Sequence, residues 1–434
     1  MSRLAGCVLT LVWSFAAGAQ TWKGNHDESA VKSYSLPDAL TLQNGKKVRT
    51  AEEWTKARRP EIVRLFEENV HGRTPATKIA PKFEVTSTDE KALQGTAIRK
   101  LVTISFPSHA NSPKINMVVY LPAAAKAPVP VFVSLSFGGI HTIDADPGLP
   151  LAEVWVRDTA APAAQSSERV GQVRKQALPE SRGQGAGRWV VGRILERGYG
   201  LAVAYYGDIE PDFNGGLKHG VRAMFLAKGE VEPAANQWGA IGAWAWGMSR
   251  MADYLVTDQQ VDSKRLAVIG HSRLGKAALW AGAQDDRFGI VISNNSGEGG
   301  AALSKRNFGE DVWRLNNNFP HWFAKSYRQW SNKEAEMPFD HHMLLALIAP
   351  RPLYVASATE DLHSDPRGEF LSAVHAGAVY QLFGKQGLGT DEMPAPEKPI
   401  MKSVGYHLRT GKHDVTAYDW DRYCDFADSH WKKQ

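Results

Sequence analysis

Gly270-His271-Ser272-Arg273-Leu274-Gly275-Lys276 is the stretch that decides which fold this chain is expected to adopt. It follows residues 265–269, a short apolar run with β-branched residues that predicts a buried strand. It precedes residues 277–283, which predict the first turns of a helix. A serine on such a turn would hold its hydroxyl above a sheet, where the N–H groups of a helix N-terminus stabilise negative charge.

A serine on a tight, glycine-flanked turn between strand and helix is typical of the nucleophile elbow of α/β-hydrolases. In this chain the second glycine comes one residue late, so Arg273 directly follows Ser272 and places a permanent positive charge beside it. The alternative is a strand end bracketed by glycines, in which Ser272 has no chemical role.

The rest of the chain alternates between predicted strands and helices. Apolar runs predict strands at 98–106, 115–121, 129–135, 200–206, 291–293 and 353–358, and helical spacing predicts helices at 52–70, 189–197 and 240–255. The first two strands are expected to be antiparallel and the later ones parallel. This order predicts an α/β-hydrolase fold: a doubly wound, mostly parallel sheet in a three-layer sandwich with surface-loop insertions.

Composition indicates an ordinary globular enzyme. The 434 residues are 43% hydrophobic and 22% charged, and the net charge of +5 is not gathered into a basic run, so nucleic acid is not indicated as a partner. We expect a signal peptide at 1–19 and a single catalytic domain at 20–434, with an insertion at about 142–187. A monomer is expected.

The N-terminus predicts export. Arg3 provides the positive region, residues 4–16 are apolar, and Ala17-Gly18-Ala19 is typical of a cleavage site. The apolar stretch is too short to span a bilayer, so no membrane association is expected. After cleavage Cys424 is the only cysteine, which excludes an intramolecular disulfide. We expect a secreted or periplasmic protein.

The elbow serine needs a base and an acid, which in this fold follow it in the order acid, then histidine. Asp361 lies just past the predicted strand 353–358 and is the expected acid, with Glu360 as its nearest competitor. His413 lies in a polar, glycine-preceded loop and is favoured over His407, which lies in a strand pattern. The imidazole would accept the serine proton, and the carboxylate would fix its tautomer.

Asp340-His341-His342 is the one spot that suggests a metal site. It runs directly into an apolar stretch, and adjacent side chains on a helix diverge, so we expect the start of a helix instead. No His-Glu-x-x-His motif or cysteine cluster supports zinc, and no metal or other cofactor is expected.

Several motifs together resemble the bacterial glucuronoyl esterases of carbohydrate esterase family fifteen. They are 270–276, Asn294-Asn295-Ser296-Gly297-Glu298-Gly299-Gly300 and Asn318-Phe319-Pro320-His321-Trp322-Phe323. Weaker likenesses occur at 58–62 and 197–208, and the resemblance extends from about residue 34 to the C-terminus.

The resemblance implies hydrolysis of the ester between 4-O-methyl-glucuronic acid of glucuronoxylan and a lignin alcohol. It implies Ser272 as nucleophile, His413 as base and Arg273 as oxyanion stabiliser. The residues expected to contact the substrate are Lys276, Glu310, Glu298, His363 and Trp322. Two departures stand out. Asn295 occupies the position of the fungal acid, so Asp361 is the expected acid, and His363 replaces a sugar-contacting tryptophan.

Two other functions remain open at this level. The first is another carbohydrate esterase, such as an acetyl xylan esterase, although an acetyl group offers nothing for Arg273, Lys276 or Glu310 to hold. The second is a non-catalytic polysaccharide-binding protein on a hydrolase fold.

Overall fold

A sheet of ten strands forms the centre of the computed structural model, which describes residues 24–109, 112–157 and 172–432. Its strands are β1 Lys82–Lys91, β2 Ala97–Ser105, β3 Ile115–Pro122, β4 Val129–Ser136, β7 Gly200–Tyr205, β8 Val261–His271, β9 Phe288–Asn294, β10 Leu353–Ala358, β11 Ile400–Met401 and β12 Val404–Arg409. The order across the sheet is β1-β2-β3-β7-β4-β8-β9-β10-β12-β11. Strands β7 through β12 in this order are parallel, whereas β1 to β3 and the edge strand β11 pair antiparallel.

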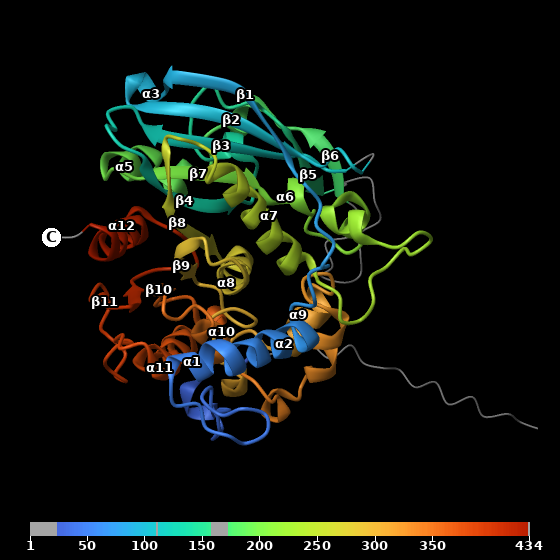
Figure 1. Ribbon diagram of the computed structural model, residues 1–434, viewed down its shortest axis with the longest axis vertical. Coiled ribbons are helices and arrows are strands. Elements are labelled where there is room, and N and C mark those ends of the chain that lie inside the picture. Colours follow the sequence, from blue (N-terminus) through green and yellow to red (C-terminus); the bar gives the residue numbers. More distant parts are fainter. Residues whose placement is uncertain (1–23, 110–111, 158–171, 433–434) are drawn as a thin grey trace, which may run out of the picture.

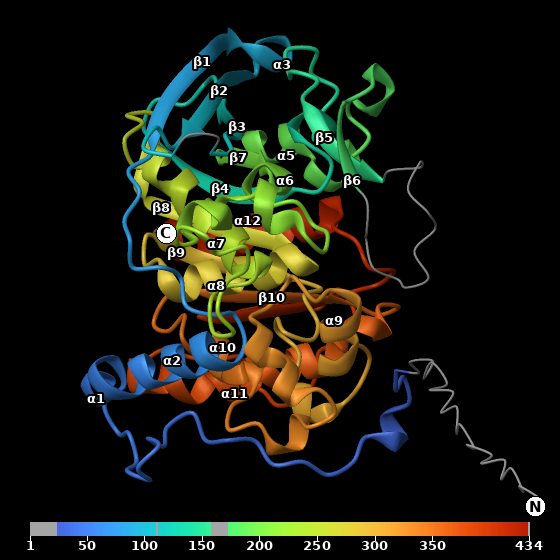
Figure 2. The same cartoon turned by 90° about the vertical axis from the view of Figure 1, so that its right-hand side faces the viewer.

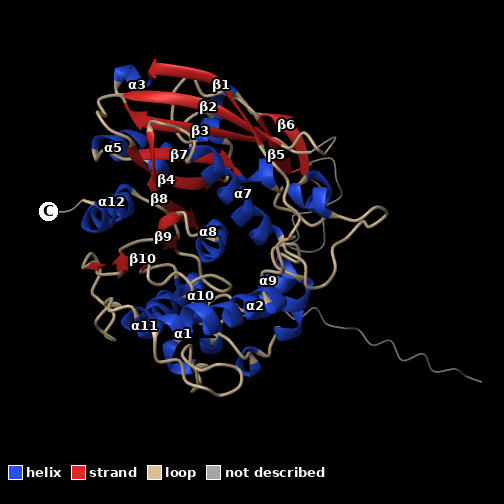
Figure 3. Ribbon diagram, in the orientation of Figure 1, coloured by secondary structure: helices blue, strands red, loops and turns tan. Residues whose placement is uncertain are grey.

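Helices cover both faces of the sheet (Figure 1). They are α1 Ala51–Glu53, α2 Arg59–Asn69, α3 Ala92–Gly95, α4 Ala186–Trp189, α5 Val191–Glu196, α6 Tyr206–Ile209, α7 Ala240–Leu255, α8 Arg273–Gln284, α9 Val312–Asn318, α10 His341–Ala346, α11 Pro366–Leu382 and α12 Ala417–Trp431, with a π-helical stretch Trp54–Arg58 joining α1 to α2. Helices α7, α8, α10 and α11 pack on one face, and α4, α5 and α12 on the other. The result is the three-layer α/β arrangement predicted from the sequence (Figure 3).

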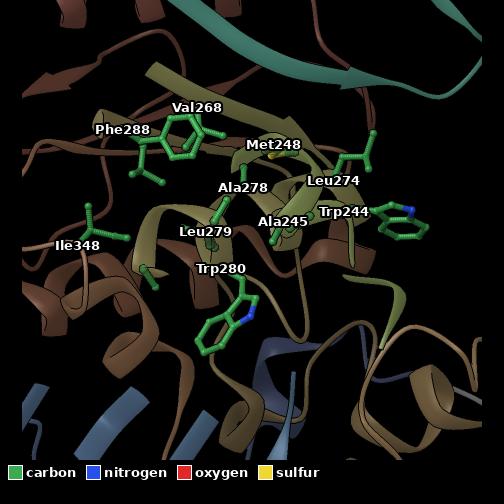
Figure 4. Close-up of a cluster of buried hydrophobic side chains, with 14 of the residues drawn as sticks. Trp244, Ala245, Met248, Val268, Leu274, Ala278, Leu279, Trp280, Phe288 and Ile348 are labelled. Atoms are coloured by element: carbon green, nitrogen blue, oxygen red, sulfur yellow. The ribbon is translucent and has the colours of Figure 1, made fainter. Parts of the chain in front are cut away.

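Two hydrophobic clusters hold these layers together, because successive strand residues point to opposite faces. In β9, Val291 packs toward α8, whereas Ile290 and Ile292 pack toward α12. Figure 4 shows the first cluster around α8, where Trp280 and Phe288 are fully buried. This packing fixes α8 against the sheet, and with it the turn at its N-terminus.

The structure agrees closely with the expected elements. Helix α7 and strand β10 have the predicted bounds, and β2 and β3 pair antiparallel as predicted. Asp340 caps α10, accepting a hydrogen bond from the backbone N–H of His341 at 2.7 Å, so this histidine pair does begin a helix.

The expected surface insertion is more regular than predicted. Strands β5 Glu153–Arg157 and β6 Gln172–Gln176 form an antiparallel pair beside the main sheet (Figure 2). The proline, alanine and polar residues of 142–187 hid this pairing. Residues 1–19, the expected signal peptide, lie outside the described part of the chain. Within that part, every helix is too short or too polar to cross a bilayer.

Candidate active site

Ser272 lies on the turn between β8 and α8. Its backbone has φ 57° and ψ −129°, a conformation that non-glycine residues rarely adopt. Such strained conformations occur mostly at functional sites. A side chain at Gly270 would place its Cβ 1.9 Å from the carbonyl oxygen of Leu274, so only glycine permits the turn. Although Ser272 caps α8, its side chain makes no capping hydrogen bond. The hydroxyl therefore does not stabilise the N-terminus of the helix.

Asp361 and His413 meet beside this turn. Asp361 Oδ2 lies 2.6 Å from His413 Nδ1, and the Asp361 side chain is only 4% exposed, whereas that of His413 is 40% exposed. Burial alone would raise the pKa of Asp361, but its hydrogen bond and charge interaction with His413 hold that pKa below the ordinary value. The competing Glu360 is exposed. His407 is buried and bonded to Asp419 at 2.9 Å.

The loop that carries His413 is fastened on both sides. Arg409 donates to the carbonyl oxygens of Lys412 at 2.8 Å and Asp414 at 3.0 Å, the residues that flank His413. The backbone N–H of Glu360 also donates to the Gly411 carbonyl at 2.9 Å, which joins this loop to the one carrying Asp361. The base and its acid are thus positioned by backbone contacts as well as by their own hydrogen bond.

Arg273, the first residue of α8, pairs with a buried carboxylate and lies against two aromatic rings. Its Nη1 donates to Asp212 Oδ2 at 3.0 Å, and its guanidinium lies over the rings of Phe137 and Trp322 at 5.2 and 5.1 Å. Asp212 is 1% exposed and also accepts from Tyr206. Arg273 Nε is buried without a hydrogen-bond partner among the described residues.

Asp212 collects further donors from the segment after α9. His321 Nε2 lies 2.9 Å and Trp322 Nε1 2.7 Å from its Oδ1. Sequence reasoning missed Asp212, because no motif surrounds it and its partners come from distant segments. His321 was within a quoted motif, but nothing in that motif indicated its role.

Lys276 lies one helical turn beyond Ser272, and its ammonium is already engaged. It donates to the carbonyl oxygens of Ser296 at 2.8 Å and Glu298 at 2.5 Å, and to Glu310 Oε2 at 3.2 Å. Burial would raise the pKa of Glu310, but the charge of Lys276 and the neighbouring His363 lower it to about 2. Glu310 is therefore an anion at neutral pH. His363, whose side chain is partly exposed, lies 3.4 Å from the other carboxylate oxygen of Glu310.

Glu298 and Trp322, the other two residues expected to contact substrate, are buried, as Lys276 also is. The Glu298 carboxyl group accepts from Ser304 at 2.6 Å and Tyr327 at 2.7 Å, and burial raises its pKa to about 8. Trp322 is 3% exposed and stacks on Phe319 with ring centroids 3.8 Å apart. The Glu298 side chain thus contacts protein, and the Trp322 ring lies beneath the charged groups of Arg273 and Lys276.

Comparison with known proteins places these features in context. A family model described as glucuronyl esterase of fungi matches residues 231–384. The carbohydrate esterase MZ0003, from an unknown prokaryotic organism, is 48% identical over 94% of this chain and 92% of its own length. A glucuronoyl esterase structure from Solibacter usitatus is 52% identical, with a TM-score of 0.88, over 93% of this chain and 100% of that one. A promiscuous CE15 esterase from a marine bacterial metagenome is 47% identical, with a TM-score of 0.85, over 94% and 100%.

Proposed function

This chain belongs to the glucuronoyl esterases of carbohydrate esterase family fifteen, and we propose that it hydrolyses esters of 4-O-methyl-glucuronic acid on glucuronoxylan with lignin alcohols through a serine acyl-enzyme. The observation that carries this proposal is the Lys276–Glu310 pair, one helical turn from Ser272. A simple acetyl ester offers nothing for these two side chains to hold.

The proposed chemistry begins with proton removal. His413 accepts the hydroxyl proton of Ser272 as the serine Oγ bonds to the ester carbon. Asp361 stabilises the resulting imidazolium through the 2.6 Å hydrogen bond. His413 then returns that proton to the leaving alcohol oxygen as the carbon–oxygen bond breaks. Water, activated by the same histidine, attacks the acyl-enzyme and releases the uronic acid.

Charge that develops on the ester oxygen needs donors. The N–H groups of Arg273 and Leu274 lie at the start of α8, before its first hydrogen bond from Gly275 to the Ser272 carbonyl at 2.8 Å, and the guanidinium of Arg273 adds a charged donor. Asp212 positions Arg273 and has no direct role in this reaction.

Recognition of the uronate ring is assigned to Glu310, with His363 at the rim. Lys276 keeps Glu310 ionised and directed, so that a ring hydroxyl can donate to the carboxylate. Glu298 and Trp322 contribute indirectly, through the Glu298 carbonyl that fixes Lys276 and the ring that supports Arg273.

Hydrolysis of benzyl glucuronate, acetylated xylan and feruloyl esters by the purified enzyme tests this function. We expect turnover of the glucuronate ester and little of the other two, with Glu310→Gln raising KM for the glucuronate. Preference for the acetyl substrate would refute the proposed function. Failure of a serine-directed fluorophosphonate to label Ser272 would refute the serine mechanism.

A further inference from the structure

A cavity of about 280 Å³ opens at the carboxyl end of β4, next to the catalytic turn. Its floor is formed by β4 and β8, and its walls by Phe137, His271, Trp189 of α4 and Trp420 of α12. Neither the nucleophile nor the group formed by Lys276 and Glu310 lines it. The mechanism described above therefore leaves this cavity unused.

The order of strands places the cavity opposite the uronate site. Strand β8 carries Ser272 at its end, with β9 on one side and β4 on the other. Lys276 bonds to the loop after β9, whereas the cavity lies at the end of β4. An ester that crosses Ser272 with its acyl part on the β9 side therefore directs its alcohol part toward the cavity.

The catalytic base borders the path from the ester to the cavity. The ring of His271, which lines the cavity, lies 4.5 Å from the ring of His413 between centroids, and at 6.2 Å it meets Phe137 edge-on. Only the ring of His271 thus lies between the cavity and His413, the residue that gives its proton to the alcohol oxygen. At the rim, Arg188 pairs with Asp414, the residue after His413.

The cavity wall suits an aromatic ring. Its buried polar groups are already satisfied, since Ser134 Oγ donates to the Ile269 carbonyl at 2.9 Å and Trp420 Nε1 donates to the Arg188 carbonyl at 2.7 Å. Burial, aided by the nearby His413, lowers the pKa of His271 to about 3, so its ring carries no charge. Trp189 is half-buried and presents an aromatic surface.

Building on the proposed function, we propose that this cavity binds the aryl group of the leaving alcohol. Ligand pockets commonly measure about 300–1,000 Å³, so a cavity at the lower limit takes a single ring. The contact between the cavity and the aryl group affects the rate of acylation only, because the alcohol leaves in that step. Ser272 Oγ bonds to the acyl carbon, the bond to the alcohol oxygen breaks, and that oxygen takes the proton held by His413. Methyl and benzyl esters then yield the same acyl-enzyme, so the cavity alters kcat/KM and leaves deacylation unchanged.

The test compares kcat/KM for benzyl and methyl glucuronate in the wild type, Trp189→Ala and Trp431→Ala. Trp431 is the matched control, because it too is partly buried against the same cluster but lies beside Tyr199 and near Gly289 at the start of β9, and it does not line the cavity. We expect the benzyl-to-methyl ratio to fall about tenfold in Trp189→Ala, from loss of aromatic contact, and to stay constant in Trp431→Ala.

A ratio of two substrates on one preparation cancels any loss of folded enzyme. Gln184→Trp provides a second variant, because Gln184 is exposed and lines the cavity, so that a larger side chain there obstructs it. An unchanged ratio in both Trp189→Ala and Gln184→Trp overturns the cavity assignment and leaves the proposed function intact. A wild type that hydrolyses neither ester overturns both.

Discussion

Replacing Arg273 by alanine is the most informative perturbation of this site, because the side chain is placed for two different roles. As an oxyanion donor it would stabilise the transition state, and losing one such donor costs about 2.7–4 kcal/mol, or about a hundred- to thousand-fold in kcat. As the partner of Asp212 it contributes to stability. After Arg273→Ala, Asp212 still accepts from Tyr206, His321 and Trp322, so we expect the free energy of unfolding to fall by about 1–3 kcal/mol.

Steady-state kinetics on benzyl glucuronate, measured well below the melting temperature, report the catalytic effect. Guanidinium denaturation curves on the same preparations report the effect on the free energy of unfolding. We expect kcat to fall much more than KM rises in Arg273→Ala. Arg273→Lys should restore stability better than kcat, because an ammonium lacks the fixed planar donors of a guanidinium. A folded Arg273→Ala enzyme with unchanged kcat would refute the catalytic role. An activity loss that follows the unfolded fraction would leave Arg273 with a structural role alone.

Three further outcomes are expected. Ser272→Ala should lower kcat by about a million-fold while the melting curve stays the same, and retention of a tenth of the activity would contradict the mechanism. Asp361→Ala should lower kcat by about ten-thousand-fold, whereas Asn295→Ala, as the matched control, should change it little; equal losses in the two would remove Asp361 from the triad. Glu310 has a folded pKa of about 2, below the value of 4.5 from which it is shifted, so the stability it contributes is present above about pH 4.5 and is lost as the pH falls toward 2. Glu310→Gln should therefore show a shallower loss of unfolding free energy over that range, measured by urea denaturation, and an identical slope in the two proteins would show that the Lys276–Glu310 pair contributes nothing.

Local sequence patterns predicted most of the fold. Buried parallel strands are continuous apolar runs, so β4, β8 and β10 were visible in the sequence, as was the serine turn between β8 and α8. The chain order of acid and histidine pointed to Asp361 and His413, which the structure places in hydrogen-bond contact. Strand β1 was missed because its side chains are mostly exposed, which leaves no apolar run to detect.

Contacts between distant segments could not be predicted in this way. Asp212 joins Arg273 across 61 residues and Trp322 across 110, and no local pattern encodes such a meeting. The same limit explains Glu298 and Trp322, which were expected to face substrate. Whether a polar or aromatic side chain near a site faces substrate or protein depends on its neighbours in space. Here Glu298 contacts Tyr327, and Trp322 stacks on Phe319.

The position of His413 near one edge of the sheet sets how this enzyme loses activity on heating. Beyond β10 lie only β12 and the two-residue β11, and the loop that leaves β12 carries His413. Local openings cost less free energy than global unfolding, but β12 is buried along its whole length, which resists such an opening. When β12 detaches, the base leaves both Ser272 and Asp361 while the central pairing of β4, β8 and β9 persists. We therefore expect activity to be lost on heating no later than the central sheet melts, which activity and circular dichroism measured on one preparation would compare.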